Sequence, residues 1–167
     1  MNKKILLLGT GRSGKDTMAE ILLDCYGLTF ASSSEFANKH FIFEALRGFM
    51  GYSSLEECFN DRHNHRDLWF QLICTYNKED PAKLAKSLLQ TADIYVGMRG
   101  KVELDTCVRE NVFDLKIFVD ASERLDYTEP KSSNQITSED ADLIIYNNGT
   151  EAKFITEVQR FYEDNIL

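Results

Sequence analysis

The sequence predicts an α/β protein, a three-layer α/β/α sandwich on a five-stranded parallel sheet. Short, nearly continuous apolar runs alternate along the chain with longer segments whose apolar residues have helical spacing. Strands buried on both faces have continuous apolar runs, so the sheet is expected to be parallel and covered by helices on both sides. The length of 167 residues fits a single domain, 1–167.

Each predicted element follows from a local pattern. The apolar runs short enough to be strands occupy residues 4–8, 28–31, 93–96, 115–119 and 142–146. Helical spacing and capping residues predict helices at about 14–25, 36–49, 53–59, 61–76, 81–89, 100–111 and from 150 onward. The stretch from 120 to 140 is polar and irregular, and we expect it to be mobile.

Composition argues against several classes of function. A formal charge of −8 and a pI near 4.9 leave no broad cationic surface for a nucleic-acid backbone, so no nucleic-acid partner is expected. No apolar segment approaches the length of a membrane span, and we expect neither a leader nor a membrane partner. The four cysteines have no metal-ligand spacing, which predicts reduced, mostly buried thiols in a cytoplasmic protein.

A phosphate-binding loop is predicted directly after the first strand. Gly9 and Gly14, with four residues between them, precede Lys15 and a helix, an arrangement in which backbone N–H groups surround a polyphosphate. Lys15 would neutralise charge between the β- and γ-phosphates of ATP, and Thr17 would suit the α-phosphate. The alternative is a glycine-rich turn with a solvated lysine. The expected ATP-binding residues are Gly9, Gly11, Arg12, Ser13, Gly14, Lys15, Asp16 and Thr17.

Asp16 occupies the position where such loops usually carry serine or threonine. Its carboxylate would approach Mg²⁺ directly or through water. The alternative is that it only complements the positive N-terminal end of the helix dipole. Mg²⁺ is therefore the expected cofactor, with Asp16 as its candidate ligand.

The residues after each strand are expected to face one crevice, because ligands bind outside the carboxyl ends of parallel strands. Arg99 follows the third strand and is the candidate that holds an acceptor phosphate. Glu103, four residues later, would either orient Arg99 or pair with it on the helix.

Further cations are candidates for acceptor binding. Arg62 and Arg66 share one face of the predicted helix over 61–76 and would clamp an anion while Trp69 covers a base. The alternative is a solvated arginine face with Trp69 in the core. Lys39 and Arg47, on the predicted helix over 36–49, are further candidates. Arg124 lies in the polar stretch, which would close over ATP as a lid and exclude water.

Several short segments together resemble a known family. GTGRSGKDT, FASSSEFA, GMR, FVDASERL and DLIIYNNGT are similar to segments of the P-loop nucleoside monophosphate kinases, most of all those of bacteriophages that act on deoxynucleotides. The resemblance implies ATP as donor, Mg²⁺, a nucleoside monophosphate as acceptor and a cytoplasmic location, the host's if the protein is phage-encoded. It also implies an acceptor-binding helical region at about 32–90 and a lid at about 120–141.

The resemblance also assigns roles by position. Ser33 and Ser34 would begin the monophosphate-binding region, Arg99 would hold the acceptor phosphate, and Arg124 would be the lid arginine near adenine or the transferred group. The chain departs from the family pattern at Asp16, where glycine is common, and Asp93 lies at the start of the third strand instead of its end. The lid has one arginine, so Arg62 or Arg66 would supply the missing charge.

The sequence therefore predicts an ATP- and Mg²⁺-dependent (deoxy)nucleoside monophosphate kinase, monomeric or homodimeric. The expected catalytic residues are Lys15, Arg66, Arg99 and Arg124. One alternative is a kinase of another small acceptor such as dephospho-CoA. A second alternative is a non-catalytic nucleotide-binding regulatory protein.

Overall fold

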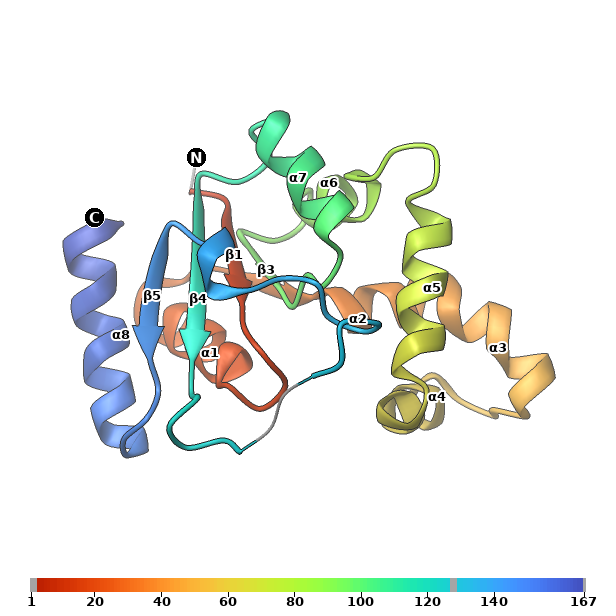
Figure 1. Ribbon diagram of the computed structural model, residues 1–167, viewed down its shortest axis with the longest axis horizontal. Helices are drawn as coiled ribbons and strands as arrows, with labels where there is room; N and C mark the ends of the chain where they lie inside the picture. The colour runs from red at the N-terminus through yellow and green to blue at the C-terminus, as the bar shows by residue number, and fades with distance from the viewer. Residues whose placement is uncertain (1–2, 127–128, 167) are drawn as a thin grey trace.

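The computed structural model describes residues 3–126 and 129–166, and its centre is a parallel sheet (Figure 1). The five strands lie in the order β2-β3-β1-β4-β5. Their bounds are Ile5–Leu8 (β1), Phe30–Ser32 (β2), Ile94–Val96 (β3), Leu115–Asp120 (β4) and Leu143–Tyr146 (β5). Every pairing is parallel, which confirms the predicted fold class.

Helices cover both faces of the sheet (Figure 1). On one face, α1 (Lys15–Tyr26) and α8 (Glu151–Asn165) pack on a core that includes Ile5 and Leu7. On the other, α6 (Lys83–Leu88) and α7 (Lys101–Arg109) pack on a core that includes Leu6 and Leu8. Successive side chains of a strand point to opposite faces, so β1 can be apolar throughout only because both faces are covered.

The remaining helices form a region beside the sheet (Figure 1). They are α2 (Ser33–Ala37), the π-helical turn η1 (Asn38–Ile42), α3 (Phe43–Met50), α4 (Leu55–Asp61), the 3₁₀ turn η2 (Arg62–Asn64) and α5 (Arg66–Tyr76). This region has its own small core, which includes Leu46, Cys58 and Trp69. A second 3₁₀ turn, η3 (Ser138–Asp140), precedes β5.

The predicted single helix over 61–76 is wrong. Asp61 ends α4, Arg62 lies in a separate 3₁₀ turn, and α5 begins at Arg66. The Asp61 carboxylate accepts hydrogen bonds from the Tyr52 hydroxyl at 2.6 Å and from Asn64 Nδ2 at 2.6 Å. Because these bonds hold the side chain against its own turn, Asp61 does not cap the next helix. Arg62 and Arg66 therefore do not share one helix face.

Two smaller expectations need correction. The helix predicted over 36–49 begins at Ser33 and contains the π-helical turn η1 before ending at Gly51. All four cysteines are free, but only Cys58 and Cys107 are buried, whereas Cys25 and Cys74 are exposed. None of the helices in the described part of the chain has both the length and the apolar character to cross a membrane.

Candidate functional site

The loop between β1 and α1 has the backbone shape that phosphate binding requires. Gly9 and Gly14 have φ values of 141° and 104°, and a Cβ at Gly9 would lie 2.6 Å from the Val119 carbonyl oxygen. Asn147, just after β5, donates to the Ser13 carbonyl at 2.9 Å. The C-terminal ends of β4 and β5 therefore lie against the loop. Gly14 is the residue directly before α1, so the loop ends at the N-terminus of this helix.

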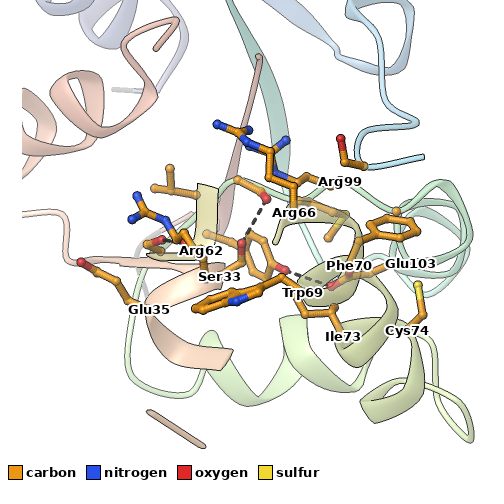
Figure 2. Close-up of a pocket in the computed structure, with 18 of the residues that line it drawn as sticks. Ser33, Glu35, Arg62, Arg66, Trp69, Phe70, Ile73, Cys74, Arg99 and Glu103 are labelled. Atoms are coloured by element: carbon orange, nitrogen blue, oxygen red, sulfur yellow. Dashed lines mark hydrogen bonds between the residues drawn. The ribbon is translucent and has the colours of Figure 1, made fainter. Parts of the chain in front are cut away.

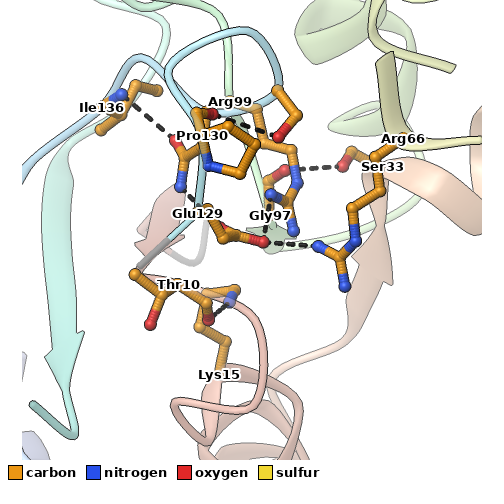
Figure 3. A network of polar contacts seen from close by, with 11 residues as sticks. Thr10, Lys15, Ser33, Arg66, Gly97, Arg99, Glu129, Pro130 and Ile136 are labelled. Carbon is orange, nitrogen blue, oxygen red and sulfur yellow. Dashed lines mark hydrogen bonds and ion pairs between the residues drawn. The ribbon is translucent and has the colours of Figure 1, made fainter. Parts of the chain in front are cut away.

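Lys15 folds back over this loop. Its Nζ donates to the Thr10 carbonyl at 2.6 Å, and only 7% of the residue is exposed (Figure 3). Burial and, to a smaller extent, the positive charge of Arg99 together lower the pKa of Lys15 to about 8. A polyphosphate in the loop would oppose both effects, because a negative charge favours the protonated amine.

Beside the loop, two arginines converge on one carboxylate (Figure 3). Arg66 Nη1 and Arg99 Nη1 lie 2.5 Å and 2.7 Å from the same oxygen, Glu129 Oε1. Burial disfavours the charged form of Glu129, but the arginines and Asn134 outweigh burial and hold its pKa below the usual value. A negative group between the two guanidinium groups offsets the repulsion between their like charges.

A cavity of about 860 Å³ opens from the loop toward the helical region. Arg62, Arg66 and Arg99 lie on one side of it, with the rings of Trp69 and Phe70 farther from the loop (Figure 2). The predicted site residues that line it are Gly11, Arg12, Lys15, Asp16, Ser33, Ser34, Arg62, Arg66, Trp69, Arg99 and Glu103. The cavity thus joins a cationic end to an aromatic end.

Besides Gly9, Ser13, Gly14 and Thr17, which belong to the loop and the start of α1, three predicted site residues do not line this cavity. Lys39 is exposed on η1, and Arg47 pairs with Glu44 at 3.1 Å, so neither lines this cavity. Arg124 contacts the loop itself, donating to the Arg12 carbonyl at 3.1 Å and to the Asn147 carbonyl at 3.2 Å. Of the four expected catalytic residues, Lys15, Arg66 and Arg99 come together and Arg124 lies apart from them.

The wall of the cavity fixes Arg62 and Trp69. The Arg62 guanidinium lies 3.8 Å from the centre of the Phe59 ring and donates to the Phe59 carbonyl at 2.9 Å. Burial lowers the pKa of Arg62, and Arg66 lowers it further. Trp69 is buried in the core of the helical region, as one of its two interpretations predicts, and it also lines the cavity.

Glu103 does not orient Arg99. Its Oε1 accepts a hydrogen bond from the Tyr95 hydroxyl at 3.0 Å. The Arg99 guanidinium instead pairs with Glu129 (Figure 3). The reason is that α7 begins at Lys101, so Arg99 precedes the helix and has no partner at the i+4 spacing. Burial raises the pKa of Glu103 to about 7, although hydrogen bonds from Tyr95 and Asn77 oppose the rise.

We expect Glu103→Gln to remove a pH dependence of stability. Because the folded pKa of about 7 exceeds the unfolded 4.5, the folded state binds more protons in between, and the wild type loses stability as pH rises through this window. The Gln variant should gain about 2 to 3 kcal/mol relative to the wild type between about pH 5 and pH 7. Urea unfolding at both pH values measures this, with exposed Glu20→Gln as control. A pH-independent difference would contradict it.

The loop offers one carboxylate, that of Asp16, as a ligand for Mg²⁺. Asp16 is exposed at the start of α1 and lines the cavity. Among the described residues, no group of three or more His, Cys, Asp or Glu side chains is placed to hold a metal. A single carboxylate fits an ion held mainly by substrate phosphates and water, which is how Mg²⁺ is commonly bound.

Comparison with known proteins identifies the fold. No protein-family model and no curated protein matches the sequence. Among solved structures, shikimate kinase from Bacteroides thetaiotaomicron has a TM-score of 0.56 at 12% identity over 99% of both chains. Dephospho-CoA kinase from Campylobacter jejuni has a TM-score of 0.52 at 16% identity, over 98% of this chain and 97% of that one. Shikimate kinase from Aquifex aeolicus has a TM-score of 0.51 at 16% identity over 97% of both. The chain therefore has the fold of small P-loop kinases.

Proposed function

We propose that the protein is an ATP-dependent kinase that transfers the γ-phosphoryl group to a (deoxy)nucleoside monophosphate. The observation that carries the proposal is the convergence of Arg66 and Arg99 on one anionic oxygen beside the phosphate loop. Transfer to a phosphorylated acceptor requires two anion sites, one for the donor phosphates and one for the acceptor phosphate. The loop would provide the first, and the two arginines would provide the second.

The residues support in-line transfer. The loop N–H groups would hold the β-phosphate of ATP, and Lys15 would exchange the Thr10 carbonyl for β- and γ-phosphate oxygens. An acceptor phosphate oxygen would then attack the γ-phosphorus as the bond to the bridging oxygen breaks, and ADP leaves with that electron pair. An ionised phosphate is already a nucleophile, so the protein needs to supply only alignment and positive charge.

The cavity also favours a nucleotide over a bare phosphate ester. Its volume of about 860 Å³ lies in the range of small-molecule sites. With the acceptor phosphate at Arg66 and Arg99, a base would extend toward Trp69 and Phe70, whose rings offer flat apolar surfaces (Figure 2). Arg62 would add positive charge along the way. Ser33 and Ser34 line the same cavity and would contact the acceptor.

Mg²⁺, when bound with ATP, would neutralise charge on the donor phosphates. We assign Asp16 as its protein-side carboxylate, either directly or through water, since it lies at the start of α1 and lines the cavity. Thr17, the next residue, would bind the α-phosphate. We place Arg124 at the nucleoside side of ATP, because it contacts the loop but does not line the cavity that Arg66 and Arg99 share.

An acceptor panel tests the proposal. We expect acceptor-dependent ADP formation in a coupled assay with ATP, Mg²⁺ and at least one of the common nucleoside or deoxynucleoside monophosphates. Shikimate and gluconate, which lack a phosphate, should give no more than the background rate. No turnover with any monophosphate would contradict the proposal.

The same panel separates two alternatives. The likeness to dephospho-CoA kinase favours that compound as a second candidate acceptor, and such an enzyme would ignore all the monophosphates. A nucleotide-binding regulatory protein would bind ATP in calorimetric titration but turn over no acceptor. The single arginine of the 120–140 stretch, Arg124, favours this second alternative, and the Arg66–Arg99 pair argues against it.

A further inference from the structure

The arginine pair is occupied by the protein's own carboxylate. Only 1% of the Glu129 side chain is exposed, and Oε1 receives both Arg66 Nη1 and Arg99 Nη1 (Figure 3). The other oxygen, Oε2, accepts from Asn134 Nδ2 at 2.8 Å. Glu129 comes from the polar stretch between β4 and β5, far in sequence from both arginines. An ion pair made by this stretch therefore fills the cationic end of the cavity.

Its place relative to the phosphate loop is specific. Glu129 Oε1 lies 3.2 Å, and the Arg66 guanidinium nitrogens 3.6 Å, from the position that a Cβ on Gly11 would occupy. The negative charge of Glu129 also acts on Lys15 and opposes part of the pKa decrease of that amine. The Glu129 carboxylate thus lies close to Lys15, Arg66 and Arg99, the cations that would stabilise phosphoryl transfer.

We infer that Glu129 is a surrogate for the acceptor phosphate, which must displace it from Arg66 and Arg99 before transfer. The inference rests on the proposed function. A carboxylate oxygen and a phosphate oxygen both accept short, charge-assisted hydrogen bonds from guanidinium groups, and one position cannot hold both. A bound phosphate dianion carries more charge than the carboxylate, so it competes effectively.

Two consequences follow for the empty and loaded site. Without acceptor, Glu129 holds the two guanidinium groups near each other, so like charges converge before substrate arrives. Glu129 also keeps Arg66 and Arg99 from the γ-phosphate, so water is not aided as an attacking group. Acceptor binding would release this restraint, and Glu129 would leave with the stretch to which Asn134 belongs.

That stretch is connected to Arg99 through its backbone as well. The Gln135 N–H donates to the Arg99 carbonyl at 2.9 Å, and the Lys101 N–H donates to Gln135 Oε1 at 3.1 Å. Displacement of Glu129 is therefore transmitted along residues 129–135 to the strand end that presents Arg99. Of the two Glu129 oxygens, the Asn134 side chain donates to the one that the arginines do not use, and its own Oδ1 accepts from the Ile136 N–H at 3.1 Å. Asn134→Ala therefore weakens the hold on Glu129 without changing any charge.

Binding of inorganic phosphate to the free protein tests the inference without any kinase activity. The Nε–H signals of Arg66 and Arg99, assigned through Arg66→Lys and Arg99→Lys, are followed by NMR during a phosphate titration. Glu129→Gln keeps the shape of the side chain but removes its charge, and we expect it to bind phosphate roughly tenfold more tightly than the wild type. Asn134→Ala should bind phosphate more tightly as well. Exposed Glu139→Gln, in the same stretch, should match the wild type.

The opposite results are equally clear. If Glu129 only fastens the stretch to the cavity, the arginines will lose order in Glu129→Gln, and phosphate will bind as weakly as to the wild type or more weakly. Circular dichroism checks that each variant is folded. If Glu129→Gln does not fold, Asn134→Ala decides the test alone. Tighter phosphate binding without turnover in the acceptor panel would support the surrogate while refuting the proposed kinase. Turnover with unchanged phosphate binding would do the reverse.

Discussion

Lys15→Ala is expected to lower kcat for phosphoryl transfer by about a hundredfold or more, the scale of losing one preorganised charge in a transition state. In the empty protein, Lys15 Nζ is held on the Thr10 carbonyl, within the loop that would receive ATP. The amine therefore needs little movement to reach the β- and γ-phosphates, where negative charge shifts during transfer. Initial rates with saturating ATP and the best acceptor of the panel measure the loss.

A matched control isolates the role of the charge. Lys153 is an exposed lysine on α8, and Lys153→Ala should leave kcat and KM unchanged. ATP binding by calorimetry shows whether Lys15→Ala loses affinity or only rate. A kcat within a few fold of the wild type would contradict the assignment of Lys15. If the wild type itself has no turnover and Lys15→Ala loses ATP binding, the result would favour a regulatory protein.

The fold was predictable because its signals are local. The strands are continuous apolar runs, and their observed ends differ from the predicted ends by no more than two residues. The phosphate loop is defined by glycine and lysine spacing within nine residues, and the left-handed φ values of Gly9 and Gly14 explain why glycine is needed there. Neither inference depends on contacts between distant parts of the chain.

The site was less predictable because tertiary contacts build it. Glu129 lies 63 residues from Arg66 and 30 from Arg99, in a polar stretch with no periodicity, so no sequence pattern marks it. Helix phase also misled the prediction for Glu103, since α7 begins two residues after Arg99. The side chain of Asp61 bonds to Tyr52 and Asn64, which separates Arg62 from α5. Residue types were informative here, but helix boundaries were not.

Arg99→Ala should lower kcat by about a hundredfold or more as well, with a rise in KM for the acceptor but little change in KM for ATP. Arg99 lies three residues after the end of β3 and lines the cavity, where both the acceptor phosphate and the transferred group would contact it. Its loss removes charge from the acceptor side of the reaction, while Lys15 still binds the donor. Steady-state kinetics with each substrate varied in turn measure the separate effects.

The comparison with Arg66→Ala makes this prediction sharper. Both arginines contact Glu129 Oε1, but Arg66 projects from α5 in the helical region, whereas Arg99 follows a strand of the central sheet. If the helical region serves the acceptor, Arg66→Ala should raise acceptor KM more than it lowers kcat. Arg109→Ala, at an exposed position on α7, is the matched control. Near-normal kcat and KM in Arg99→Ala would remove Arg99 from the site and leave Arg66 and Arg62 as the remaining cations for the acceptor phosphate.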